Sequence, residues 1–132
     1  MRISRSTGYA LLAVGYIIQH PEQKIVLSQT IAKEYDIPLE YLLKIMQQLV
    51  RANVLNSKRG PRGGFSLAKS PKKLNMLQII EAVDGPLASR LNLVEQAPKE
   101  KFSVLAEKAY ERAIAQARSV FEKTKLSDLI KA

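Results

Sequence analysis

The sequence predicts a mainly α-helical protein that contains one small β-hairpin and ends in a long helix. Apolar residues recur at helical spacing along most of the 132 residues. Strand-like alternation follows one segment, the glycine-rich turn of residues 58–65, which reads KRGPRGGF. The longest uninterrupted helical pattern runs from Lys99 to about Lys123.

The composition excludes several classes of protein. With 46% hydrophobic residues, the chain can form one packed domain. It has no cysteine for a disulfide or a thiolate metal site, and its single histidine excludes a histidine-based zinc site within one chain. The apolar run at residues 9–18 is too short to span a bilayer, and the N-terminus lacks signal-peptide features. We therefore expect a cytoplasmic protein with no metal and no cofactor.

Positive charge is concentrated in the first half of the chain. Residues 1–75 contain 12 Lys and Arg against 4 Asp and Glu, whereas residues 76–132 contain 9 against 8. The segment 51–73 includes seven cations and no acid. Such a basic face is either only solvated or binds a polyanion, and its place on a hairpin after two helices favours nucleic acid.

The first predicted helix begins at a hydroxyl residue between Ser4 and Thr7 and ends before Pro21. Because its apolar residues cover most of the circumference, we expect it in the middle of the core. Arg2 and Arg5 lie near its N-terminus, where unpaired N–H groups also favour anions, and are candidate phosphate contacts. The residues that recur at helical spacing are Tyr9, Ala10, Leu12, Ala13, Tyr16, Ile17 and His20, of which His20 is expected to cap the helix end or lie at the surface.

Two further helices separated by a tight turn are predicted next. Residues 24–27 form either a minor strand or an extended link, and Ser28 begins a short helix that reaches Tyr35. The break at residues 36–38 ends in a proline, which is tolerated at the first position of a helix. The third helix is expected from about Pro38 to Ala52.

The third helix has an apolar face and a polar face. The apolar residues expected to pack on the core are Leu39, Leu42, Leu43, Met46, Leu49 and Val50. The polar residues are Glu40, Tyr41, Lys44, Gln47, Gln48 and Arg51. Gln can pair with adenine, and Lys or Arg with guanine. A polar face is often only solvated, but one between a short helix and a basic hairpin is typical of the recognition helix of a winged helix-turn-helix.

The basic turn is expected at the tip of the hairpin, or wing. Glycine permits close backbone approach and proline fixes φ, so the turn presents its cations at a sharp tip. A phosphate-cradling nucleotide loop is the alternative. That motif ends in Gly-Lys-Ser/Thr and leads into a helix, whereas Gly64 leads into a strand pattern.

A fourth helix completes the predicted winged helix-turn-helix domain, residues 1–85. Asn75 can cap it, residues 85–86 end it, and its expected core residues are Met76, Ile79, Ile80 and Val83. Residues 86–98 show no clear periodicity and are predicted to form a connecting loop, whose leucines pack on a neighbour.

Residues 99–132 are predicted to form a dimerisation helix and a C-terminal tail. A seam of mostly small apolar side chains would let another helix approach closely. The candidate dimer residues on and beside it are Phe102, Leu105, Ala106, Ala109, Ala113, Ala117 and Val120. A homodimer contact is the favoured interpretation, and an intramolecular fit is the alternative.

Four motifs occur in a characteristic order: MRIS leading to GYAL at residues 8–11, IPLEYL at 37–42, RGPRGGF at 59–65 and IIEAVDG at 79–85. In this order they resemble the Rrf-two (Rrf2) family of bacterial transcription regulators. That family includes the iron-sulfur cluster regulator, the nitric-oxide-sensing repressor and the cysteine-metabolism repressor. The resemblance is close over residues 1–85 and extends beyond them in layout.

The resemblance implies a dimeric winged helix that binds an inverted-repeat operator, usually as a repressor, with Arg59 at the minor groove. Some relatives carry an acid where this chain has Leu43, so its base preference is expected to differ. The segment 86–98 lacks the three cysteines of cluster-binding members, so no iron-sulfur cluster is expected. The resemblance implies DNA contacts at residues 39–44 of the third helix and at Ser57, Arg59 and Pro61 of the wing. With the residues indicated by the polar face, the basic turn and the helix N-termini, the candidate DNA-binding residues are Arg2, Arg5, Ser28, Leu39, Glu40, Tyr41, Lys44, Gln48, Ser57, Lys58, Arg59, Pro61 and Arg62.

The sequence therefore predicts a homodimeric, sequence-specific regulator of transcription that binds double-stranded DNA, with repression as the expected sign. The alternative is a winged helix that serves as a protein-interaction module. No catalytic dyad or activated nucleophile is visible, so no enzymatic activity is expected. The effector is left open between an unidentified protein, a small molecule and none.

Overall fold

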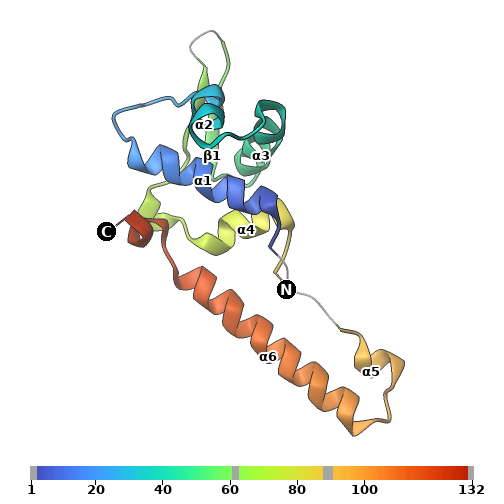
Figure 1. Ribbon diagram of the computed structural model, residues 1–132. Helices are drawn as coiled ribbons and strands as arrows, with labels where there is room; N and C mark the ends of the chain where they lie inside the picture. The colour runs from blue at the N-terminus through green and yellow to red at the C-terminus, as the bar shows by residue number, and fades with distance from the viewer. Residues whose placement is uncertain (1–2, 61–62, 88–90, 131–132) are drawn as a thin grey trace.

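The computed structural model describes residues 3–60, 63–87 and 91–130. It is mainly helical with one two-stranded hairpin and a long C-terminal helix, which confirms the predicted fold class (Figure 1). The elements in chain order are α1 Arg5–Gln19, α2 Ser28–Tyr35, α3 Leu39–Arg51, β1 Leu55–Lys58, β2 Gly64–Leu67, η1 Pro71–Lys73, α4 Met76–Asp84, α5 Leu93–Gln96, α6 Lys101–Lys123 and η2 Leu126–Ile130.

Helix α1 lies at the centre of the body, between α3 above it and α4 below it in Figure 1. Ser4 caps the helix by accepting a hydrogen bond from the Thr7 N–H at 3.2 Å. Ala10 and Ala13 are fully buried, as expected for a central helix. The prediction for Leu12 was wrong: it is 42% exposed, because the helical rotation places it on the side opposite Ala10.

Helices α2 and α3 form a helix-turn-helix. Asp36 adopts the left-handed conformation with φ of 54°, and the N–H of Ile37 donates to the Ala32 carbonyl at 2.9 Å. The left-handed residue and this hydrogen bond close the end of α2 and turn the chain directly into α3.

The buried side of α3 faces the core that α1 also lines. Its buried residues are Leu42, Ile45, Met46 and Leu49. Ile45 is a further core residue, outside the predicted apolar face. Leu39, Leu43 and Val50 are only half-buried at the edge of this core.

The hairpin pairs β1 and β2 in antiparallel register, with Leu55 opposite Leu67 and Lys58 opposite Gly64. The link before α2 adds a single bridge rather than a strand: Val26 and Phe65 exchange two backbone hydrogen bonds of 2.8 Å. The base of the hairpin is therefore fastened to the link between α1 and α2.

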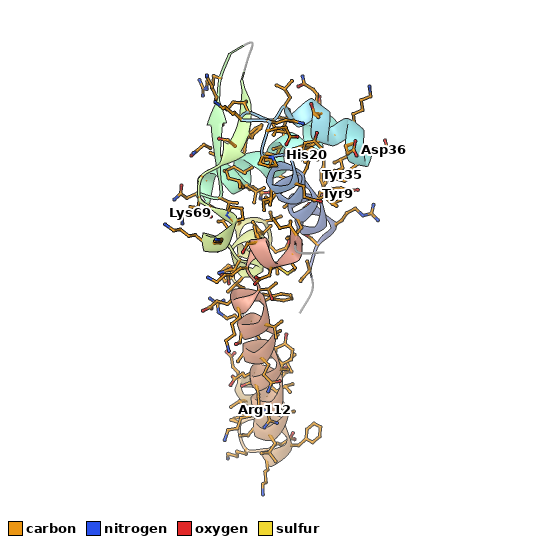
Figure 2. All side chains as sticks on the ribbon, turned by 90° about the vertical axis from the view of Figure 1, so that its left-hand side faces the viewer. Tyr9, His20, Tyr35, Asp36, Lys69 and Arg112 are labelled. Atoms are coloured by element: carbon orange, nitrogen blue, oxygen red, sulfur yellow. The ribbon has the colours of Figure 1, made fainter. Side chains whose placement is uncertain are left out.

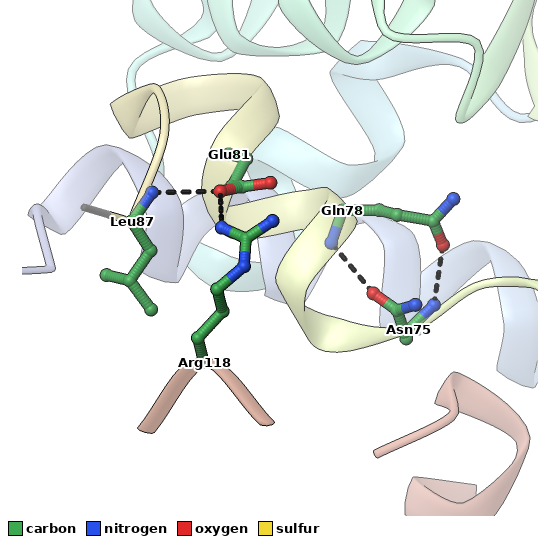
Figure 3. Close-up of polar contacts among 5 residues, drawn as sticks. All are labelled: Asn75, Gln78, Glu81, Leu87 and Arg118. Carbon is green, nitrogen blue, oxygen red and sulfur yellow. Dashed lines mark hydrogen bonds and ion pairs between the residues drawn. The ribbon is translucent and has the colours of Figure 1, made fainter. Parts of the chain in front are cut away.

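Helix α4 begins with a capping box between Asn75 and Gln78 and has Leu77, Ile79 and Ile80 buried (Figure 3). Leu77 was not predicted in the core, whereas Met76 and Val83 are half-buried beside it.

Helix α6 extends away from the body on the side opposite the hairpin, as both overall views show (Figures 1 and 2). The chain then returns to the body through two backbone hydrogen bonds, from the Met76 N–H to Thr124 at 3.0 Å and from the Leu126 N–H to Leu74 at 2.9 Å. Leu126 is buried there. No helix in the described ranges is both long and apolar enough to cross a membrane.

The connecting segment contains a short helix, α5, where a loop is predicted. The Glu107 carboxylate of α6 accepts hydrogen bonds from the N–H groups of Leu93 at 2.8 Å and Val94 at 3.5 Å, so it satisfies the first turn of α5. Leu87 is buried, while Leu91 is 44% exposed.

Candidate nucleic-acid interface

The exposed side of α3 carries a row of polar side chains at spacings of four, three and four residues. This row consists of Glu40, Lys44, Gln47 and Arg51, all of which are exposed. Tyr41 and Gln48 lie beside it, Tyr41 at 40% exposure and Gln48 half-buried. Such a helix face can enter a major groove and meet base edges and phosphates with donors and acceptors.

Tyr41 is held in place by α1. Its ring meets the ring of Tyr9 edge to face, with centroids 5.7 Å apart and an interplanar angle of 89°. Its hydroxyl shares a hydrogen bond with the hydroxyl of Ser6. Ser6 also borders a hollow with Tyr41, Lys44 and Gln48, so α1 contributes to the surface that α3 presents. The sequence contains no local signal for this role of Ser6.

A cleft of about 380 Å³ separates α3 from the hairpin. It is lined by Gln47, Val50, Arg51, Ser57, Lys58, Arg59, Gly64 and Phe65. Gln47 and Arg51 border both this cleft and the hollow beside Tyr41. Neither was among the candidate DNA-binding residues, although their spacing from Glu40 and Lys44 on the polar face could have identified them.

Glycine is required where the hairpin packs closely on other backbone. A Cβ on Gly63 would lie 2.1 Å from the Lys58 carbonyl oxygen, and a Cβ on Gly64 would lie 2.5 Å from the Val26 carbonyl oxygen. These distances are below any normal contact. The two glycines therefore let the hairpin close and let it sit against the α1–α2 link.

The remaining candidates are distributed unevenly over the structure. Ser57, Lys58 and Arg59 are exposed on the hairpin, and Arg5 is exposed at the start of α1. Ser28, at the start of α2, is 8% exposed, so little of its surface is available to a ligand. Leu39 is half-buried against the core. The predictions for Arg2, Pro61 and Arg62 lie outside the described residues.

The cations of this surface have no acidic partner in the described part of the chain. The ion pair found there joins Arg118 to Glu81 at 2.6 Å, on the α4–α6 side. Lys44, Arg51, Lys58 and Arg59 are therefore available for an external anion. Glu40 is the acid among them, at the first turn of α3, where a carboxylate is favourable to the helix.

The candidate dimer residues lie mainly on the outward face of α6. Phe102 is 79% exposed, Leu105 54% and Val120 62%, and Ala109 and Ala113 are also exposed. Ala106 and Ala117, at the margin of this face, are half-buried. We call the five exposed residues, Phe102, Leu105, Ala109, Ala113 and Val120, the α6 stripe.

A model of the Rrf2 family, described as an iron-dependent transcriptional regulator, matches residues 3–132. This chain belongs to the Rrf2 family. A protein of Aquifex aeolicus (strain VF5) described as an HTH-type transcriptional regulator is 32% identical over 98% of the chain and 92% of its own length. The regulator IscR of Cereibacter sphaeroides is 26% identical over 99% of the chain and 88% of its own length. The structure of CymR, the global cysteine regulator of B. subtilis, has a TM-score of 0.83 at 22% identity and covers 98% of this chain and 95% of its own.

Membership in the Rrf2 family makes this protein an HTH-type transcriptional regulator and not an enzyme, and it implies DNA binding. The family description names iron dependence, and iron can be held only where the chain supplies suitable donor atoms. Iron-sulfur clusters in proteins are held mainly by cysteine thiolates, and this Rrf2 chain contains no cysteine. Across the described ranges, no cluster of three or more histidine and carboxylate side chains is placed to hold a metal ion. The residues present do not fit the cluster.

Proposed function

We propose that this Rrf2 protein binds an inverted-repeat operator as a homodimer and represses transcription in the cytoplasm. The observation that supports this best is the continuous surface formed by the polar row of α3, the cleft beside it and the basic hairpin. Lys58 and Arg59 flank the cleft on one side and Arg51 on the other. A strand of DNA backbone that enters the cleft would have cations on both sides, with α3 in the major groove and the hairpin in the neighbouring minor groove.

The homodimer is supported by the α6 stripe. Phe102, Leu105 and Val120 are large apolar side chains left more than half exposed within the single chain. Ala109 and Ala113 lie between them and would let a second helix approach closely. A second copy of the chain carries the same stripe. Around a two-fold axis, the stripe of one copy can pack on the stripe of the other.

A two-fold symmetric dimer also accounts for an inverted repeat. Two copies of α3 would enter successive major grooves about 34 Å apart, and each hairpin would insert Arg59 into a flanking minor groove. Because the chain lacks the cysteine ligands of a cluster, release from DNA would not be controlled by iron-sulfur chemistry, and a protein, a small molecule or no effector are the alternatives.

Selection from a library of random DNA duplexes tests the proposed function. We expect the 132-residue protein to enrich one inverted repeat, and the affinity for that duplex to fall by orders of magnitude over a few-fold rise in salt. Recovery without any sequence preference, or no recovery at low salt, would count against a sequence-specific regulator. The second result would favour a protein-interaction module.

A further inference from the structure

Asp84, the last residue of α4, is bound to the first turn of α1 by three hydrogen bonds. Its Oδ2 accepts from the N–H of Ser4 at 3.0 Å and from the hydroxyl of Thr7 at 2.7 Å. Its Oδ1 accepts from the hydroxyl of Ser4 at 2.5 Å. Thr7 is fully buried, so its hydroxyl depends on this carboxylate rather than on water. Asp84 therefore fixes where α1 begins and in which direction it runs.

The same turn of α1 holds Tyr41 on the polar face of α3. Ser6, which shares its hydrogen bond with the Tyr41 hydroxyl, lies between Ser4 and Thr7 in the sequence. One helical turn thus connects the Asp84 carboxylate with the Tyr41 hydroxyl. A shift of that turn would move the Ser6 hydroxyl away from Tyr41 and loosen a side chain that is 40% exposed at the hollow beside Lys44.

We propose that Asp84 is a positioning residue for DNA recognition, which sets Tyr41 through the first turn of α1. Asp84 contacts Ser4 and Thr7 and is not among the residues that line the α3 hollow or the cleft at the hairpin, so its proposed effect passes through α1. The inference rests on the proposed function, because its main readout is affinity for DNA.

The sign of the effect separates positioning from general electrostatics. Removing a carboxylate makes the protein more cationic and strengthens binding to any DNA slightly. Loss of a positioning residue has the opposite effect, since a loosened Tyr41 contributes less binding energy. Asp84→Ala is therefore expected to weaken DNA binding even though it removes a negative charge.

The experiment is a double-mutant cycle on the 132-residue protein. The probe is a duplex that the wild-type protein has enriched from the random library, and affinity is measured by fluorescence anisotropy. We expect Asp84→Ala to weaken binding by about 5- to 10-fold in the wild-type background. In the Tyr41→Phe background, which keeps the ring on Tyr9 but removes the hydroxyl, we expect Asp84→Ala to have an effect of less than about twofold.

The control is Glu22→Ala, which removes the same charge from an exposed residue beyond the opposite end of α1. We expect it to leave the affinity unchanged or slightly raised. Thr7→Val removes one hydrogen bond to the Asp84 carboxylate without changing the net charge. It should also weaken DNA binding, as Asp84→Ala does.

Two results would overturn the inference: folded Asp84→Ala protein with wild-type affinity, or equal effects of Asp84→Ala in the two Tyr41 backgrounds. If Asp84→Ala does not fold, equal effects of Thr7→Val in those backgrounds overturn it instead. A wild-type protein that enriches no duplex contradicts the proposed function itself, so the two failures are distinguishable.

Discussion

Burial alone would raise the pKa of the Asp84 carboxyl, but hydrogen bonds from the Ser4 hydroxyl, the Ser4 N–H and the Thr7 hydroxyl together lower that pKa below its ordinary value. The folded protein therefore binds this proton less tightly than the unfolded chain. It follows that Asp84 stabilises the fold above the ordinary Asp pKa of about 3.9, and that this contribution is lost as the pH falls through the lowered pKa.

The corresponding prediction concerns thermal stability as a function of pH. We expect Asp84→Asn to melt below the wild type at neutral pH, and the difference to shrink as the pH falls below about 4. Circular dichroism melts between pH 7 and pH 2 measure it. A difference in melting temperature that stays constant over this range would show that the charge of Asp84 is not responsible.

At the same scale, Arg59 and Lys72 are expected to differ although both are cations in the basic segment. Arg59 lines the cleft, whereas Lys72 is exposed in η1 and is not among the residues of that cleft. Arg59→Ala should weaken operator binding by about 5- to 100-fold, and Lys72→Ala should cause a small loss that is the same for every sequence. Titrations with the selected duplex and with a scrambled duplex test this. Equal losses for both variants would contradict the role of Arg59.

At the scale of elements, the attachment of the hairpin is the feature most open to a test. A Cβ on Gly64 would also lie 2.7 Å from the Ile25 side chain, so Gly64→Ala must push the hairpin away from the α1–α2 link. We expect a loss of stability of about 1–3 kcal/mol and weaker operator binding, because the cleft changes shape. Chemical denaturation and duplex titration measure the two effects.

Gly8 supplies the matched control for this substitution. It lies within α1, and a Cβ there would meet no atom within 4 Å. Gly8→Ala is therefore expected to stabilise the protein by up to about 1 kcal/mol, through the higher helix propensity of alanine. If Gly64→Ala were equally harmless, the hairpin would not depend on close approach at this position.

The elements differed in how far the sequence could predict them. The bounds of α2 and the end of α6 were predicted correctly, because proline breaks and apolar periodicity are local signals. Helix α5 was missed because the carboxylate that satisfies its first turn comes from Glu107, fourteen residues further along. The sequence does not distinguish a strand from an extended link at residues 24–27, because the single pair of residues that forms the bridge at Val26 shows no alternation.

The candidate interface was predictable to the same extent. The polar face of α3 and the basic turn follow from spacing and composition. The contacts of Ser6 with Tyr41 and of Asp84 with Ser4 join residues 35 and 80 positions apart, and no local pattern contains them. Gln47 and Arg51 were visible on the polar face, but their position at the cleft depends on where the hairpin packs.

At the scale of the whole molecule, α4 connects the helix-turn-helix body with α6. At its start, Thr124 and Leu126, which follow α6, form backbone hydrogen bonds with Met76 and Leu74. Near its end, one oxygen of Glu81 accepts from Arg118 of α6 at 2.6 Å and from the N–H of Leu87 at 2.8 Å (Figure 3). Helix α6 is therefore attached to the body at two places on α4, and the proposed dimer would hold two bodies in a defined relation.

This arrangement makes the α6 stripe the place to separate dimerisation from DNA contact. Ala113→Glu places a charge in the middle of the stripe, where a second helix would bury it without a partner, so we expect a monomer. A monomer binds one half-site at a time and loses the joint binding of two, so affinity for the inverted repeat should fall on the order of 100-fold.

Ala115→Glu introduces the same charge two residues further on, at an exposed position on the other side of α6, and should remain dimeric with nearly unchanged affinity. Analytical ultracentrifugation and duplex titration report the two properties separately. Dimeric Ala113→Glu protein would place the contact between copies elsewhere, whereas a monomer with full affinity would show that the operator is read by one copy at a time.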